Sequence, residues 1–235
     1  MQFVFPAQPV ASVAVHGTDA RFPVRRIFCV GRNYEAHARE MGKDPSREPP
    51  FFFLKPADTV MDDGAEVPYP PETANFQHEI ELVIAIGTGG VDITEAKALD
   101  HVFGYAVGID LTRRDLQLKA RDQGRPWDWG KGFDHSAPIA PIRPVSQVGH
   151  PLTGRIWLSV NGQVKQDQDI ADLIWNVREI ISIASHSMRL MPGDLIMTGT
   201  PAGVSPLVAG DHVEGGIDGL GRITINVAPP LGKAA

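Results

Sequence analysis

The sequence feature that most constrains the fold is the stretch of residues 75–87, NFQHEIELVIAIG, in which two glutamates precede an unbroken apolar run. Five apolar residues in a row before a glycine are typical of a short strand that is buried on both faces. Side chains alternate between the faces of an extended chain, so Glu79 and Glu81 point to one side and Ile80 to the other. The sequence therefore predicts a sheet with two carboxylates side by side at the entrance to its core.

Two carboxylates in such a position repel each other and lose hydration, which raises their pKa values unless a cation compensates them. A hard divalent ion such as Mg²⁺, Mn²⁺ or Ca²⁺ is the simplest such cation, because it prefers several carboxylate and water oxygens. The alternative for an isolated Glu-x-Glu pair is that the strand end faces solvent and both side chains are hydrated. A third acidic residue nearby would favour the metal site.

A candidate for this third carboxylate ends another apolar segment, residues 103–110, FGYAVGID. Asp110 could bind the metal ion, and it could also cap the N-terminus of the helix predicted over residues 111–121; the two roles are compatible. On that helix Arg114 and Gln117 are three residues apart and share a face. A guanidinium and an amide at this place could bind a substrate carboxylate or a developing oxyanion.

A second group of candidates lies on the short helix predicted over residues 33–42, with Asn33 as its N-cap. His37 and Glu40 are three residues apart, so they lie on one helical face and can pair. They are either ordinary surface residues or a dyad in which the imidazole takes a proton from water near neutral pH. The Pro-containing loop that follows, residues 43–50, could let this helix move as a lid.

Other polar residues have simpler expected roles. Lys55 ends the apolar strand predicted over residues 51–56, and its ammonium is expected to reach solvent. His78 is expected to begin the strand of the two glutamates with its ring bonded to backbone, because a hard-metal site does not need imidazole. Lys131 lies between two glycines in an irregular loop, where it either approaches a ligand closely or is solvated.

Composition limits the partners and the compartment. The 235 residues carry a net charge of -6, which argues against a nucleic acid or an anionic membrane as the partner. No apolar run is long enough to span a bilayer, and the N-terminus lacks the positive charge of a signal peptide. The single cysteine, Cys29, cannot form an internal disulfide and is expected to be a core residue, so a reducing cytoplasm is the expected location.

The remaining chain is expected to supply a scaffold of strands. Residues 1–24 are predicted to form a small N-terminal β hairpin extension. Residues 155–165 predict another hairpin with an Asn-Gly turn, and residues 169–188 predict an amphipathic helix. Residues 192–204 predict a strand that opens into a glycine-rich turn, whose amides could bind a small anion.

Taken in order, these segments resemble the fumarylacetoacetate hydrolase superfamily over about residues 27–227. The resemblance is carried by GRNYEAHARE, FFFLKP, HEIEL, GYAVGIDLTRRDLQ, GRPWDWGKGFD, PGDLIMTGTPAGV and GLGRITINV. Each segment is weak evidence alone, but their joint order is specific. The chain length and GRPWDWGKGFD are most similar to the branch that hydrolyses acylpyruvates such as fumarylpyruvate, a step of gentisate degradation.

The resemblance implies an α+β fold, a β-rich mixed β-sandwich roll with a few short helices, in which residues 25–235 form the catalytic domain. It also implies a homodimer and one bound Mg²⁺ or Mn²⁺ ion, held by Glu79, Glu81 and Asp110. The other roles that it implies are catalytic for His37, Glu40, Gln117 and Lys131 and substrate-binding for Arg32, Arg114 and Thr200.

The activity implied by the resemblance is metal-dependent hydrolysis of a carbon–carbon bond in a 2,4-dioxo acid. The same residues could instead decarboxylate or isomerise oxaloacetate or a related β-keto acid, because both reactions need a stabilised enolate. A non-enzymatic metal- or sugar-acid-binding β protein is the alternative from another class, and it would require the helix of His37 to be a static surface element.

Overall fold

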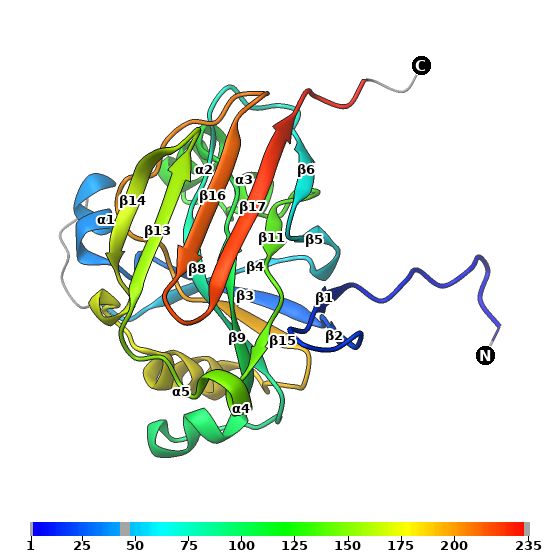
Figure 1. The fold of residues 1–235 in the computed structure, drawn as a ribbon, viewed down its shortest axis with the longest axis vertical. Coiled ribbons are helices and arrows are strands. Elements are labelled where there is room, and N and C mark those ends of the chain that lie inside the picture. The colour runs from blue at the N-terminus through cyan, green and yellow to red at the C-terminus, as the bar shows by residue number, and fades with distance from the viewer. Residues whose placement is uncertain (1, 43–47, 233–235) are drawn as a thin grey trace.

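The structure, a computed structural model, describes residues 2–42 and 48–232. Two β-sheets pack face to face, and the helices between the strands are short (Figure 1). The predicted α+β architecture, rich in mixed sheet with few helices, is confirmed. Within the described ranges no helix has the length and apolar character needed to cross a membrane.

The larger sheet is mixed, since most neighbouring strands are antiparallel but two pairs run parallel. Its strands are β3 (Arg26–Gly31), β4 (Phe51–Lys55), β5 (Val60–Asp62), β8 (Ile80–Ile86), β9 (Val102–Ile109), β11 (Ala137–Ile139), β12 (Arg143–Pro144) and β15 (Asp194–Met197). Their order is β4-β3-β15-β8-β9-β11-β5, and β12 pairs with β9 beside this path. The parallel pairs are β15 with β3 and β11 with β5. In the strand order, β8 lies in the middle of the sheet.

The smaller sheet covers one face of the larger one, as the front strands of Figure 1 show. Its strands are β6 (Ala65–Pro68), β13 (Arg155–Val160), β14 (Gln163–Asp169), β16 (His212–Ile217) and β17 (Gly221–Ala228), in the order β14-β13-β16-β17-β6. The predicted hairpin is β13–β14. Asn161 and Gly162 at its turn have φ angles of 51° and 80°, which fits the type I′ geometry expected for Asn-Gly.

Strand β8 is buried on both faces, which explains its unbroken apolar sequence. Ile80, Leu82 and Ile84 belong to the core between the two sheets. Val83 and Ala85 belong to a second core on the opposite face. This second core includes side chains from β1 (Ser12–Ala14) and β2 (Arg21–Pro23), which pair as the N-terminal hairpin. The division of the chain into residues 1–24 and 25–235 stays a prediction.

We expect Ile84→Ala to lower the free energy of unfolding by about 2–5 kcal/mol, because it leaves a cavity in a close-packed core. Ile84 is completely buried. Urea unfolding followed by circular dichroism measures the change, and the slope with denaturant should stay constant. Val164→Ala, at a side chain that is 52% exposed, is the control and should change stability by less than about 0.5 kcal/mol.

Short helices and two-residue strands connect the sheets. The α-helices are α1 (Glu35–Glu40), α2 (Arg114–Asp122), α3 (Asp128–Lys131), α4 (Val145–Val148) and α5 (Val177–Ser187). The 3-10 helices are η1 (Ala57–Thr59), η2 (Glu95–His101) and η3 (Ile170–Asp172), and the short strands β7 (Phe76–Gln77) and β10 (Thr112–Arg113) pair with each other.

Several predicted helix limits were wrong. The helix predicted over residues 169–188 begins only at Val177, because the preceding chain continues β14 and turns through η3, and Asn176 caps the true start. Helix α2 begins at Arg114 rather than at residue 111, because β10 pairs with β7 first. Asp110 therefore caps no helix.

Two further predictions differ at the site itself. Asn33 is not the N-cap of α1, since Tyr34 occupies that position without a side-chain hydrogen bond. Lys131 lies at the end of α3 and not in an irregular loop. Of the loop predicted to let α1 move as a lid, residues 43–50, the part at residues 43–47 lies outside the described residues.

Candidate active site and metal centre

The strand pairing of β8 places the three predicted carboxylates together. The antiparallel register pairs Ile80 with Ile109 and Glu81 with Gly108, so Asp110 continues beside Glu79, and its N–H donates to the Glu79 carbonyl at 2.8 Å. Opposite residues of an antiparallel pair point to the same face. Glu79 and Asp110 thus project together.

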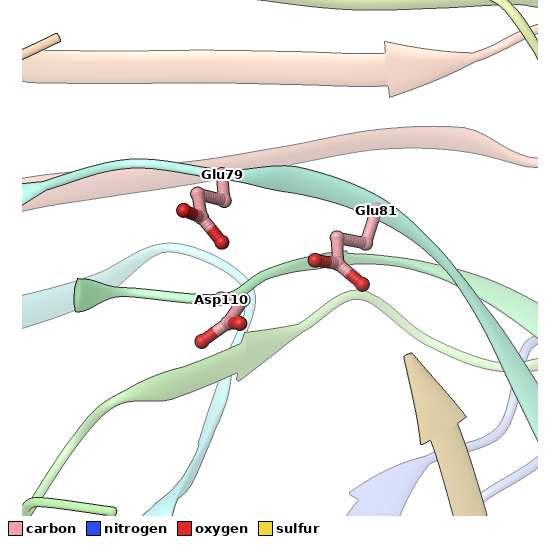
Figure 2. A group of neighbouring side chains, drawn as sticks. All are labelled: Glu79, Glu81 and Asp110. Carbon is pink, nitrogen blue, oxygen red and sulfur yellow. The ribbon is translucent and has the colours of Figure 1, made fainter. Parts of the chain in front are cut away.

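The carboxylates of Glu79, Glu81 and Asp110 turn toward one another (Figure 2). One oxygen from each lies within 4.8 Å of the others, and all three side chains are buried. Three buried carboxylates repel each other strongly at this separation unless cations compensate them. The cluster predicted from the sequence therefore exists, although the residues are separated by up to 31 positions along the chain.

Three buried cations surround the cluster. Lys131 Nζ donates to Glu79 Oε2 at 2.7 Å, to Asp110 Oδ2 at 2.6 Å and to Thr112 Oγ1 at 2.7 Å. Lys55 Nζ lies 2.9 Å from Asp110 Oδ1, and the Arg114 guanidinium donates to Glu79 Oε1. Three carboxylates and three cations make the formal charge of the cluster close to zero. A divalent ion would make it positive, which suits an anionic substrate.

Among the described residues, no cation forms an ion pair with Glu81, unlike Glu79 and Asp110. Burial, together with the charges of Asp110 and Glu79, raises the pKa of Glu81 well above its usual range, and its Oε2 accepts a hydrogen bond from the Gly199 N–H at 2.6 Å. Burial also tends to raise the pKa of Glu79, but Lys131 and Arg114 outweigh it and lower that pKa. The cluster is therefore short of positive charge at Glu81.

These residues fit a divalent metal ion. Three carboxylates are the hard oxygen donors that Mg²⁺ and Mn²⁺ prefer. The undercompensated carboxylate of Glu81 supplies the reason for a further cation, since one placed between the three groups would remove the repulsion that burial creates. The centre is thus able to hold one Mg²⁺ or Mn²⁺ ion, as predicted.

His37 and Glu40 of α1 pair as their spacing predicts. His37 Nδ1 lies 3.0 Å from Glu40 Oε2, and because a carboxylate accepts, the ring donates from Nδ1 and keeps Nε2 as its acceptor. The imidazole is buried, with 6% of its residue surface exposed, and lines the same pocket as the three carboxylates. His37 is not an ordinary surface residue.

Glu40 is held from the other side by the turn after β15. The Gly203 N–H donates to Glu40 Oε1 and Oε2 at 3.1 and 3.3 Å. Burial tends to raise the pKa of Glu40, but the hydrogen bonds from His37 and Gly203 outweigh it and lower the pKa. The carboxylate is therefore ionised at neutral pH and remains an acceptor for the imidazole.

We expect Gly203→Ala to reduce kcat about threefold to thirtyfold, a part of the 10²–10⁴ that a positioned base contributes. Gly203 has a φ of 100°, and a β-carbon there would overlap the Lys165 carbonyl oxygen, so the turn must shift and release Glu40. Steady-state kinetics measure the loss. Gly64→Ala is the control, because Gly64 has a φ of 79° but no atom within 4 Å of the added carbon.

Most of the other predicted residues line the same pocket. Gln117 Oε1 accepts a hydrogen bond from Arg114 Nη1 at 2.5 Å, which leaves the amide protons as the free donors of this side chain. The Thr200 hydroxyl donates to the Ile80 carbonyl at 2.8 Å, so its one proton is used inside the protein. The predicted site residues that line the pocket are Arg32, His37, Glu79, Glu81, Asp110, Arg114, Gln117 and Thr200.

The sequence interpretation of Lys55 was wrong. Its ammonium does not reach solvent but is buried, donating to the carbonyls of Leu111 and Lys131 at 3.1 and 2.5 Å beside the ion pair with Asp110. Burial lowers the pKa of Lys55, and the charge of Asp110 opposes this shift. The sequence of β4, an apolar run that ends in Lys55 and Pro56, does not indicate that the end of this strand lies inside the protein.

His78 has side-chain partners rather than the backbone partner that was predicted. Its Nδ1 lies 2.9 Å from Gln166 Oε1 and its Nε2 lies 2.9 Å from Ser205 Oγ. Gln166 also donates to Thr200 Oγ1 at 2.8 Å. The predicted hairpin ended at residue 165 and no role was predicted for Gln166, so only the packing of the two sheets shows that this amide supports the turn at the site.

Fold and site together define a β-rich protein with a buried three-carboxylate centre beside a His-Glu dyad. Residues 26–228 match the family described as fumarylacetoacetate (FAA) hydrolase C-terminal. The chain belongs to the fumarylacetoacetate hydrolase family, and the resemblance noted in the sequence is confirmed.

Individual relatives include two fumarylpyruvate hydrolases and an oxaloacetate tautomerase. A fumarylpyruvate hydrolase from a Ralstonia species is 48% identical over 186 residues, which cover 79% of this chain and 96% of the relative. The crystal structure of fumarylpyruvate hydrolase from Pseudomonas aeruginosa in complex with Mn²⁺ and pyruvate matches with a TM-score of 0.96 and 53% identity, covering 97% of this chain and 100% of that one. The mitochondrial oxaloacetate tautomerase of Arabidopsis thaliana is 40% identical over 202 residues, 86% of this chain and 90% of that protein.

Proposed function

We propose that this protein hydrolyses a carbon–carbon bond of a 2,4-dioxo acid, with fumarylpyruvate or a related acylpyruvate as the substrate and pyruvate as one product. The observation that carries the proposal is that a His-Glu dyad and a three-carboxylate centre line one pocket. The likeness to fumarylpyruvate hydrolases supports the choice of substrate class.

Glu79, Glu81 and Asp110 would hold the divalent ion, Mg²⁺ or Mn²⁺. When bound, such an ion polarises the adjacent oxygens of a dioxo acid and stabilises the negative charge that develops on the departing pyruvate portion. Arg114 and Lys131 fix the orientation of Glu79 through the hydrogen bonds described above. Their charges also favour the approach of an anionic substrate.

His37 takes a proton from water at Nε2, while Glu40 holds the ring through Nδ1. The water oxygen attacks the carbonyl carbon at position 4 of the substrate. The bond between carbons 3 and 4 then breaks, its electron pair stays on carbon 3 as the pyruvate enolate, and the acyl group leaves as a carboxylic acid. The proton that His37 took from water then goes to carbon 3, which completes pyruvate and restores the neutral imidazole.

The amide protons of Gln117 are assigned to the oxyanion that forms at carbon 4, because its oxygen already accepts from Arg114. Lys131 was the other candidate for this role. It already uses three hydrogen bonds on Glu79, Asp110 and Thr112, so we assign it to the carboxylates. Arg32 and Thr200 contribute to the wall of the substrate pocket.

A panel of 2,4-dioxo acids with added Mg²⁺ or Mn²⁺ tests the proposal, since cleavage removes the absorbance of the conjugated diketo acid. Acylpyruvates should yield pyruvate, and chelation should stop the reaction. No pyruvate from any acylpyruvate by metal-loaded protein would refute the hydrolase.

Oxaloacetate chemistry is the second candidate, and the 40% identity to an oxaloacetate tautomerase favours its inclusion. It would use the same carboxylates and cations without water attack on a carbonyl. The panel should therefore include oxaloacetate, with decarboxylation and tautomerisation followed separately. Faster turnover of oxaloacetate than of every acylpyruvate would replace the hydrolase with this activity.

We further propose that the protein acts in the cytoplasm as a homodimer, in the breakdown of aromatic compounds by way of gentisate. The single buried cysteine fits a reducing compartment. The likeness to fumarylpyruvate hydrolases supports the pathway. Light scattering of the purified protein tests the dimer.

A further inference from the structure

The pocket between the carboxylates and His37 is too small for a whole dioxo acid. Its volume is about 30 Å³, which corresponds to about two water-sized groups. A substrate that places its two oxo groups near the carboxylates must therefore extend its acyl group out of this pocket. What lies at the pocket mouth decides which acyl groups fit.

A groove of about 550 Å³ continues from the mouth. Arg32, Phe53, Arg121 and Trp127 line both the pocket and the groove, so the two spaces adjoin at these side chains. The volume of the groove is enough for an acyl chain, and Phe53 and Trp127 provide apolar walls for its carbon atoms.

The groove gathers positive charge in a protein of net charge -6. Arg32, Arg121 and Arg125 line it, against one carboxylate among its described lining residues, that of Asp128. Arg121 pairs with Asp122, whose side chain is 64% exposed. Within the described ranges no salt bridge engages Arg32 or Arg125, and the Arg32 guanidinium instead lies 5.3 Å from the centre of the Phe51 ring.

Helix α2 carries residues of both the groove and the pocket beside the carboxylates. Arg121 follows Arg114 by seven residues and Gln117 by four, so the three side chains share one face of the helix. Seven residues of α-helix advance roughly 10 Å along the axis. A chain of about seven carbons whose oxo-acid end lies beside Arg114 can therefore bring its far end to Arg121.

We propose that Arg121 and Arg125, with Arg32 at the mouth, bind a carboxylate at the far end of the acyl group. The site then selects 2,4-dioxo acids with two carboxylates over those with an uncharged acyl group. Guanidinium groups bind carboxylates through paired, charge-assisted hydrogen bonds, which gives such selection both strength and geometry. This inference rests on the proposed function and specifies its substrate class.

The first test compares fumarylpyruvate with the 2,4-dioxo acid of equal length in which a methyl group replaces the distal carboxylate. Metal-loaded wild-type protein should favour fumarylpyruvate in kcat/KM by at least about tenfold, as charge-assisted hydrogen bonds allow. In Arg121→Gln/Arg125→Gln this ratio should fall about tenfold to hundredfold, mainly through KM. Arg222→Gln, at an exposed arginine paired with Glu214 on the smaller sheet, should keep the wild-type ratio.

An unchanged ratio in the double variant, or no preference in the wild type, would overturn the inference. Each single variant, Arg121→Gln and Arg125→Gln, should lower the ratio by a smaller factor. The single variants therefore still test the inference if the double variant misfolds. Near-ultraviolet circular dichroism checks that the variants keep the native packing.

A second measurement separates this inference from the proposed function. Calorimetry with Mn²⁺-loaded protein compares fumarate with crotonate, its counterpart with a single carboxylate. If wild-type protein cleaves neither dioxo acid, the proposed function fails, and binding alone decides the subsite. Tighter binding of fumarate that is lost in the double variant supports it, and equal binding of the two acids overturns it.

Discussion

Glu81→Gln is expected to abolish both metal binding and turnover. The amide keeps the volume of the side chain and an oxygen that can accept from the Gly199 N–H, so the turn after β15 should remain in place. The change removes one anionic donor from a set of three, and neutral amides bind hard divalent ions less strongly than carboxylates do. Because loss of a Lewis acid removes several kcal/mol of transition-state stabilisation, kcat/KM should fall about a thousandfold or more.

Metal binding and activity are measured separately in this experiment. Calorimetry with Mn²⁺ gives the affinity, and the fumarylpyruvate assay gives turnover. The same replacement at Glu66, an exposed carboxylate of β6 that accepts from Asn226, is the control and should leave both unchanged. Wild-type turnover in a chelator-treated Glu81→Gln sample would remove the three-carboxylate centre from the mechanism.

The variant should also reveal the electrostatic cost of the empty centre. Glu81 is the carboxylate whose pKa burial and its acidic neighbours raise, so the metal-free protein loses stability as the pH rises from the ordinary carboxyl pKa through that raised folded pKa. The sign follows from linkage, because the folded state holds the proton more tightly than the unfolded chain. Metal-free Glu81→Gln should therefore be at least as stable as the metal-free wild type at neutral pH, and Mn²⁺ should stabilise only the wild type.

The local features of the site could be predicted because they depend on short-range periodicity. Alternation along one strand places Glu79 and Glu81 on the same face, whatever the strand pairs with. Helical spacing does the same for His37 and Glu40. The run after Glu81 indicated a strand buried on both faces, and the two cores that cover β8 are the physical reason for it.

What the sequence could not predict depends on which strands become neighbours. Gly199 donates to Glu81 only because β15 lies beside β8 in the sheet. Lys55 faces Asp110 because β4 ends inside the protein, and its sequence reads equally well as a strand that ends at the surface. The roles proposed for Arg32 and Lys131 came from the family resemblance, because no local pattern could assign them.

The helix predicted over residues 169–188 failed for a similar reason. Its apolar spacing was real from Val177 onward, where α5 buries one face. Before that point, β14 pairs with β13 through a register that reaches Asp169. Residues 170–172 then form the 3-10 helix η3, and Leu173 bridges to Tyr34, so these contacts keep the segment out of the α-helix. Two capping residues, Asp169 and Asn176, were present, and only the second begins an α-helix.

His37→Ala is expected to lower kcat about 10²-fold to 10⁴-fold while Mn²⁺ affinity stays at the wild-type value. The imidazole is the group we assign to remove a proton from water, and a positioned general base contributes a factor of this size. The metal affinity should persist because His37 is not part of the three-carboxylate cluster. Single-turnover kinetics and calorimetry on the same sample measure the two quantities.

Glu40→Gln provides the matched test of the dyad, because it should reduce kcat less than His37→Ala does. The amide can still contact Nδ1 and the Gly203 N–H, but it no longer supplies a charged acceptor that fixes the ring with its proton on Nδ1. The wild-type pairing should persist well into acid, since the pKa of Glu40 is lowered and its acceptor is lost only as the pH falls through that lowered value. If His37→Ala hydrolysed fumarylpyruvate at the wild-type rate, water activation would have to come from another group. Helix α1, which carries His37, would then serve only to shape the pocket.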